Sequence, residues 1–137
     1  MKINGRYLIG DLSSNLSRHE FSCQCGCGLN TVDFELVKWI QDAADYLINS
    51  TGRPISIKIT SGNRCKIHNK AIGGSPSSLH IKCRAADHKF YYKDNNEQVP
   101  PETVAELYEA RHPECGIGRY DNRTHLDSRG YKSRWTG

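Results

Sequence analysis

Apolar residues recur at helical spacing between residues 32 and 49, where the chain reads VDFELVKWIQDAADYLIN. The repeating positions are Leu36, Val37, Ile40, Ala43, Ala44, Leu47 and Ile48. Residues three and four apart share one face of an α-helix, so this pattern predicts a helix that packs on a core. Thr31 is the predicted N-cap, Asp33 lies in the first turn, and residues 51–54, TGRP, end the helix.

The next segment, residues 55–60, alternates apolar and polar side chains as ISIKIT. A period of two predicts a strand with one buried face. A second strand is predicted over residues 85–91. Between Arg64 and His80 the chain is rich in glycine and serine, which predicts a loop with one short helical turn around residues 65–72.

The C-terminal third of the chain predicts a helix and a hairpin. The helix begins at Pro101, because proline at the first helical position lacks only an N–H that would have no partner there, and it ends at residues 112–113. Residues 116–120 and 124–128 are predicted to pair around a turn. The fold class that follows is α+β, a small antiparallel sheet flanked by helices.

Length and charge narrow the class of protein. A chain of 137 residues can bury roughly two-thirds of its unfolded surface, so we expect one domain, residues 1–137. Nineteen basic against fifteen acidic residues give a net charge of +4 without a basic stripe, so we expect no nucleic-acid partner. We also expect a monomer.

The N-terminal residues and the hydropathy bear on location. No window is apolar enough to span a membrane, and residues 1–10 lack the apolar core and small-residue cleavage site of an export signal. We therefore expect a protein that is cytoplasmic when made.

Three residues suggest metal chemistry: His80, Asp87 and His125. Two imidazoles and one carboxylate bind Zn²⁺ and leave the fourth tetrahedral position to water, which is typical of a catalytic site. His80 follows a polar loop rather than lying on an apolar face. Asp87 follows two alanines, among which an unpaired carboxylate would be costly without a cation. The ordinary alternatives are a core histidine and a surface acid.

These residues belong to a longer series of motifs. In order, the chain contains Ser61-Gly62-Asn63-Arg64, Gly73-Gly74, Ser78 with His80 and Asp87, Gly116-Ile117-Gly118-Arg119-Tyr120, His125, Asp127, Arg129-Gly130 and Arg134-Trp135. This order resembles the zinc D-Ala-D-Ala carboxypeptidase and L-Ala-D-Glu endopeptidase family, whose domain is shared by the hedgehog signalling fragment. The resemblance covers about residues 21–135. It implies a hedgehog/DD-peptidase-like fold.

The same resemblance implies a function. Zn²⁺ would be held by His80, Asp87 and His125, and the substrate would be an amide bond in the peptide stems of bacterial peptidoglycan. Either the terminal D-Ala-D-Ala bond or the internal L-Ala-D-Glu bond fits, and a lytic role favours the internal one. Without an export signal, such an enzyme would reach the wall by lysis, a pore or a particle, which suggests a phage endolysin-like protein.

The proton-transfer group is the least determined part of the site. Arg64, by resemblance, holds the scissile carbonyl or a substrate carboxylate, with a surface salt bridge as its alternative. In many relatives the base is an acid three residues before the last ligand, and here that residue is Asn122, which cannot move a proton. Asp127 is the predicted base and Asp121 the second candidate. Asp127 could instead orient a ligand or pair with Arg129.

The cysteines raise two further questions. Cys83 stands where the family's pattern has glycine, and a positive φ there would cost roughly 1 to 2 kcal/mol. Its thiol is expected to be inert, with competition for the metal as the alternative. Residues 23–27, CQCGC, do not have the spacing of zinc knuckles, so a structural metal is not favoured, and no disulfides are predicted.

The sequence also fits a second function. The missing acid at Asn122 and the hedgehog resemblance fit a non-catalytic, zinc-stabilised binding module of the same fold. Retention of Arg64 and Asp127 counts against it.

Overall fold

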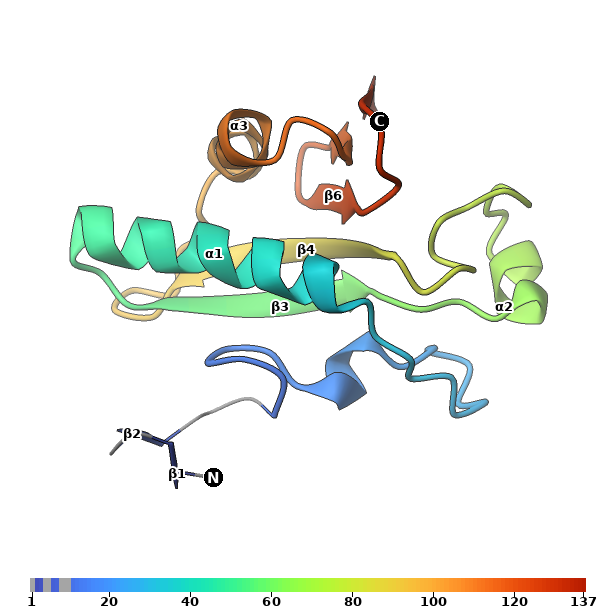
Figure 1. The fold of residues 1–137 in the computed structure, drawn as a ribbon, viewed down its shortest axis with the longest axis horizontal. Helices are drawn as coiled ribbons and strands as arrows, with labels where there is room; N and C mark the ends of the chain where they lie inside the picture. Colours follow the sequence, from blue (N-terminus) through green and yellow to red (C-terminus); the bar gives the residue numbers. More distant parts are fainter. Residues whose placement is uncertain (1, 4–5, 8–10) are drawn as a thin grey trace.

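The computed structural model describes residues 2–3, 6–7 and 11–137 (Figure 1). Along the chain it contains β1 (Lys2–Ile3), β2 (Arg6–Tyr7), the 3-10 helix η1 (Arg18–Phe21), α1 (Phe34–Thr51), β3 (Ile55–Ser61), α2 (Lys66–Ala71), β4 (Ala85–Tyr92), α3 (Pro101–Arg111), β5 (Gly116–Arg119), β6 (Thr124–Asp127) and β7 (Ser133–Thr136). β1 and β2 form a separate antiparallel pair. The other strands form one sheet in the order β3-β4-β6-β5-β7, so the predicted α+β class is confirmed.

The sheet differs from the prediction at one edge. β3, β4, β6 and β5 pair antiparallel, as expected, but β7 adds a strand parallel to β5. The segment that forms β7 is short and carries no alternating apolar pattern, so nothing local in the sequence predicted it. The other predicted elements, including the short helix α2 and the β5–β6 hairpin, are confirmed within a residue or two.

The start of α1 corrects one prediction. The helix begins at Phe34, and its N-cap is Asp33 rather than Thr31. The Asp33 carboxylate accepts a hydrogen bond from the Leu36 N–H at 3.3 Å, which satisfies one of the free donors of the first turn. At the other end Gly52 adopts a left-handed φ of 70° and closes the helix.

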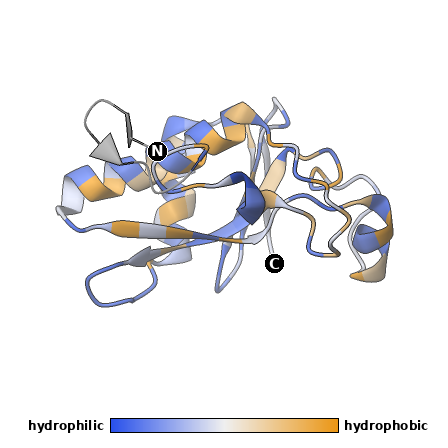
Figure 2. Ribbon diagram, turned by 90° about the horizontal axis from the view of Figure 1, so that it is seen from below, coloured by the Kyte–Doolittle hydropathy of each residue, from blue (hydrophilic) through white to orange (hydrophobic). Residues whose placement is uncertain are grey.

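The hydrophobic core lies between one face of the sheet and helices α1 and α3, which contact each other (Figure 1). Figure 2 shows hydrophobic and hydrophilic residues together along α1, as expected of a helix with one buried face. The helical contribution to the core includes Leu36, Ile40, Ala44, Val104 and Tyr108. No helix of the described residues is both long and apolar enough to cross a membrane.

Strand alternation separates this core from a polar face of the sheet. On β4, Ala86 and Phe90 belong to the core, so Asp87 points to the opposite face. On β6, Leu126 belongs to the core, so His125 and Asp127 share the face of Asp87. All of these residues are nevertheless buried, which means that the polar face is itself covered.

A buried polar contact fixes the position of β4 against α3. His88 Nε2 lies 2.7 Å from the Tyr108 hydroxyl, and His88 Nδ1 lies 3.1 Å from the Ala86 carbonyl. Burial lowers the pKa of His88 to about 4, so the ring is neutral at neutral pH. This contact holds β4, the strand that carries Asp87, in position against α3.

Candidate metal centre

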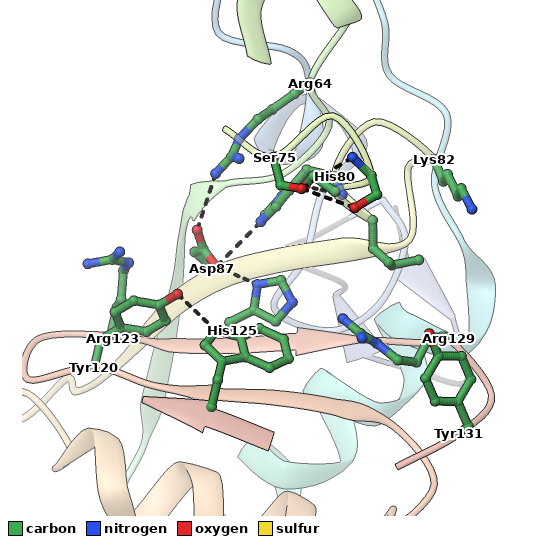
Figure 3. A pocket seen from close by; sticks show the side chains of 14 residues that line it. Arg64, Ser75, His80, Lys82, Asp87, Tyr120, Arg123, His125, Arg129 and Tyr131 are labelled. Carbon is green, nitrogen blue, oxygen red and sulfur yellow. Dashed lines mark hydrogen bonds and ion pairs between the residues drawn. The ribbon is translucent and has the colours of Figure 1, made fainter. Parts of the chain in front are cut away.

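The fold brings the three predicted ligands together. One potential ligand atom from each of His80, Asp87 and His125 lies within 4.8 Å of the others. Asp87 and His125 are partners across the β4–β6 ladder, and His80 comes from the turn just before β4. Figure 3 shows the three side chains converging. Their exposed fractions are only 3%, 7% and 6%.

Each imidazole is held from behind by an acceptor. His80 Nδ1 lies 2.7 Å from the Gly62 carbonyl, which leaves Nε2 facing Asp87 Oδ1 at 3.5 Å. His125 Nε2 lies 2.8 Å from Asp127 Oδ2, which leaves Nδ1 2.9 Å from the same Asp87 oxygen. An outer hydrogen bond of this kind sets the tautomer and orientation of a metal-binding histidine.

The electrostatics of the group fit a cation. Burial alone would lower the pKa of His125, but its hydrogen bonds to Asp127 and Asp87 outweigh burial and raise it. Burial would raise the pKa of Asp87, but hydrogen bonds with His125 and His80 hold it far below its usual range. These shifts favour a proton on His125 Nδ1, between this ring and the Asp87 carboxylate. A metal ion would replace that proton, and two nitrogens with one oxygen suit Zn²⁺.

Arg64 lies beside the predicted ligand Asp87. Its Nη2 lies 3.6 Å from Asp87 Oδ2, and its other nitrogens contact Ser61 Oγ at 3.1 Å and Asn69 Oδ1 at 3.3 Å. Gly74 explains how Asn69 fits there, because a Cβ on Gly74 would lie 2.1 Å from Asn69 Oδ1. The glycine pair of the motif thus supports the arginine that precedes it.

Asp127 is placed behind the site. Its carboxylate is completely buried and lies 2.8 Å from His125 Nε2. Arg129 Nε and Nη2 donate to its two oxygens at 2.8 Å each, and the Gly116 N–H donates to Oδ1 at 3.2 Å. A Cβ on Gly116 would lie 2.3 Å from the carboxylate, so the glycine makes room for it.

These contacts favour the orienting role of Asp127 over that of a base. Burial would raise the pKa of Asp127, but hydrogen bonds from Arg129 and His125 lower it well below its usual range. A carboxylate with such a low pKa is a poor proton acceptor at neutral pH. It also does not line the pocket in front of the ligands.

Asp121 is not brought to the ligands. It is exposed and lines a separate hollow together with residues that include Pro101, Glu102 and Arg119. The neighbouring Asn122 is also exposed, and its carbonyl accepts a hydrogen bond from Gln98 at 2.8 Å.

A pocket of about 550 Å³ opens in front of the ligands. Its walls are formed by Arg64, Ser75, Ser77, Ser78, Leu79, His80, Lys82, Asp87, Tyr120, Arg123, His125, Arg129, Tyr131 and Trp135. Asp87 is the only carboxylate among these residues, whereas Arg64, Lys82, Arg123 and Arg129 are cationic. The pocket therefore suits an anionic ligand. Sequence reasoning did not assign Lys82 or Arg123 to it.

Tyr120 and Trp135 were quoted only as parts of motifs, and the structure gives them a place. The Trp135 ring packs 4.8 Å from the His125 ring, and its Nε1 donates to the Tyr120 hydroxyl at 3.0 Å. A Cβ on Gly118 would lie 2.6 Å from Trp135 Nε1. Glycine inside a strand marks such close approaches, so the GIGRY segment held the signal for this aromatic wall.

Cys83 lies in the turn between the first two ligands. Its φ is 58°, which confirms the left-handed conformation expected where the family's pattern has glycine. Burial raises the pKa of its thiol, which supports the inert role.

The family model described as Peptidase M15 matches residues 14–127, which contain all three predicted ligands, Arg64 and Asp127. A search of curated proteins found no match.

Proposed function

The chain belongs to the peptidase M15 family, and we propose that it is a zinc peptidase that hydrolyses an amide bond in the peptide stems of bacterial peptidoglycan. The observation that carries this proposal is the convergence of His80, Asp87 and His125 at the wall of an open pocket. Ligands that face a pocket leave room for a substrate, unlike those of a closed structural site.

The ion would be held by His80 Nε2, His125 Nδ1 and the Asp87 carboxylate. When bound, Zn²⁺ supplies Lewis-acid polarisation of a carbonyl oxygen and lowers the pKa of water to about 7. The Gly62 carbonyl and the Asp127 carboxylate keep the two imidazoles in the required tautomers and orientations.

Arg64 is proposed to contact the substrate. Ser61 and Asn69 fix its guanidinium at the pocket wall, so little side-chain entropy is lost when it binds an oxygen. A planar guanidinium can hold a carboxylate through two hydrogen bonds or stabilise a developing oxyanion. Arg123 and Lys82, on other parts of the wall, would attract the free carboxylates of a stem peptide.

We assign Asp127 to positioning His125, and we keep its role as the base as the alternative that mutation must test. Asp121 is a weaker candidate, since it lines a different hollow. Tyr120 is a further polar group at the pocket. Its hydroxyl oxygen accepts the Trp135 N–H, so its own proton is available to a substrate oxygen.

The second candidate function is a zinc-stabilised binding module without catalysis. The observation that favours it is that, among the residues that the structure describes, Asp87 is the one carboxylate at the pocket wall. A cationic pocket of this kind would still bind an acidic peptide.

Digestion of purified peptidoglycan separates the two functions. We expect the zinc-loaded protein to release peptide fragments, the His80→Ala variant and a chelated sample to release none, and the fragment masses to identify the bond. Binding without cleavage by protein that holds zinc in the pocket would favour the binding module. The place of action would be the bacterial cell wall, whereas the release route and a phage source stay predictions.

A further inference from the structure

A second group of potential metal ligands lies outside the pocket. Cys23, Cys25 and Cys27 come from the loop after η1, and Cys65 is the N-cap residue of α2. The four sulfur atoms all lie within 4.8 Å of one another. The Cys23 and Cys25 sulfurs are 3.4 Å apart, and those of Cys25 and Cys65 are 3.7 Å apart. All four are free thiols in the structure.

These separations fit a tetrahedral metal ion rather than disulfides. Four sulfurs at about 2.3 Å from one Zn²⁺ lie about 3.8 Å from one another, whereas a disulfide requires about 2.05 Å. The two observed separations, 3.4 and 3.7 Å, are slightly shorter than the first distance and far longer than the second. Four thiolates also suit zinc better than they suit harder cations such as Mg²⁺ or Ca²⁺.

The backbone around the cysteines supports the same arrangement. Gly26, between Cys25 and Cys27, and Gly28, directly after Cys27, adopt left-handed φ values of 82° and 89°, which let the loop turn back on itself. Two backbone N–H groups point at sulfur. The Cys65 N–H donates to Cys23 Sγ at 3.4 Å, and the His68 N–H donates to Cys65 Sγ at 3.3 Å. Such donors stabilise the charge of a thiolate.

We propose that Cys23, Cys25, Cys27 and Cys65 form a closed structural zinc site. Four protein ligands complete the tetrahedral shell and leave no position for water or substrate. The site is therefore distinct in chemistry from the pocket centre. The spacing of the first three cysteines does not predict this site, because the fourth ligand, Cys65, is remote in sequence.

The position of this cluster suggests what it holds in place. Cys65 directly follows Arg64 in the chain. The residues of η1 and of the loop after it contact the segment before Arg64. The Asn63 N–H donates to the Phe21 carbonyl at 2.9 Å, and Gln24 Nε2 donates to the Thr60 carbonyl at 2.6 Å.

The contact extends to a glycine that serves the pocket. A Cβ on Gly62 would lie 2.7 Å from Phe21 Cα, so only glycine allows this approach. The Gly62 carbonyl is also the acceptor that orients His80. A metal ion at the cysteines would therefore fix the segment that presents both Arg64 and the His80 acceptor to the pocket.

Metal content measured on the whole chain tests the proposal. Wild-type protein prepared with reductant and loaded with Zn²⁺ should bind one ion at each cluster. The Cys25→Ser/Cys65→Ser variant should lose one ion and keep that of the pocket, whereas His80→Ala should do the reverse. Cys83→Ser is the matched control, since Cys83 lies outside the cluster, and it should keep both ions.

Substitution with Co²⁺ supplies a readout whose deciding measurement is made on the wild-type protein and so does not depend on a variant folding. Wild-type and His80→Ala proteins loaded with Co²⁺ should show intense thiolate-to-cobalt charge-transfer absorption, and the double cysteine variant should lose it. Absence of this absorption from reduced wild-type protein would overturn the proposal, as would paired disulfides in freshly purified protein. Neither result depends on peptidoglycan cleavage, so failure here leaves the proposed function standing.

Discussion

The two clusters of potential metal ligands differ in the parts of the fold that carry them. His80, Asp87 and His125 are buried, and two of the three lie on adjacent strands in register. In the cysteine cluster three members lie on one loop, and Cys25 and Cys27 are exposed. The first cluster faces a pocket, whereas the second is formed by four soft ligands with no open position in the proposed site.

This difference indicates how each cluster depends on its ion. Backbone pairing and outer hydrogen bonds hold the pocket residues in place, which is the preorganisation that the proposed catalysis needs. Loop cysteines have no ladder to align them, so the binding energy of a metal is also energy that orders the loop. The comparison predicts loss of activity from damage to the pocket and loss of local order from damage to the cysteines.

The largest effect is expected from His80→Ala. Removal of one of the three pocket ligands should reduce peptidoglycan hydrolysis by roughly 10³-fold or more, because the stabilisation supplied by a metal is worth several kcal/mol. Rates of fragment release measure this. His19→Ala, at an exposed histidine of η1, should retain wild-type activity. Equal rates in wild type and His80→Ala would contradict the assignment of the pocket.

Asp127→Asn should have the next largest effect and should distinguish the two roles of that residue. If Asp127 orients His125, metal affinity should fall about 10- to 100-fold and excess Zn²⁺ should restore much of the activity. Zinc titration of the hydrolysis rate gives the answer. Activity that stays lost at saturating zinc, with the ion bound, would instead assign Asp127 as the base.

Cys65→Ser should reduce the order of the cysteine loop more than it reduces hydrolysis. Because Cys65 does not line the pocket, hydrolysis should fall by less than about tenfold, equivalent to about 1.4 kcal/mol. The loop that contains Cys23 should become susceptible to protease, which mass spectrometry of a limited digest would detect. If the loop of the variant resisted protease as well as that of the wild type, the proposed dependence of the loop on a metal ion would be wrong.

Cys83→Gly should have the smallest effect, with the opposite sign. Glycine removes a left-handed penalty of roughly 1 to 2 kcal/mol but loses more chain entropy on folding, so the free energy of unfolding should rise by about 0.5 to 1 kcal/mol. Denaturant unfolding measures the change. Asn96→Gly is the matched comparison, because Asn96 has a similar φ of 62° and asparagine tolerates it better, so its gain should be smaller.

Local patterns were sufficient for most elements of the fold. The helical spacing of apolar residues predicted α1, the period of two predicted β3, and Pro101 marked the start of α3. Each signal reflects the geometry of a single element, either the repeat that places side chains on one face or the free N–H groups of a first helical turn. The N-cap of α1 was wrong because Thr31 and Asp33 are both suitable residues and only the backbone path selects one. β7 was missed because its pairing with β5 is long-range.

The sequence by itself determined the identity of the pocket residues, because His80, Asp87, His125 and Arg64 belong to an ordered set of motifs with characteristic chemistry. Only the tertiary structure decided what lies behind and around them. It placed Asp127 between His125 and Arg129, and it placed Asp121 at a separate hollow. It also brought Cys65 close to cysteines that are far away in the chain. Those relations depend on strand register and on the docking of one loop against another, which residue spacing does not encode.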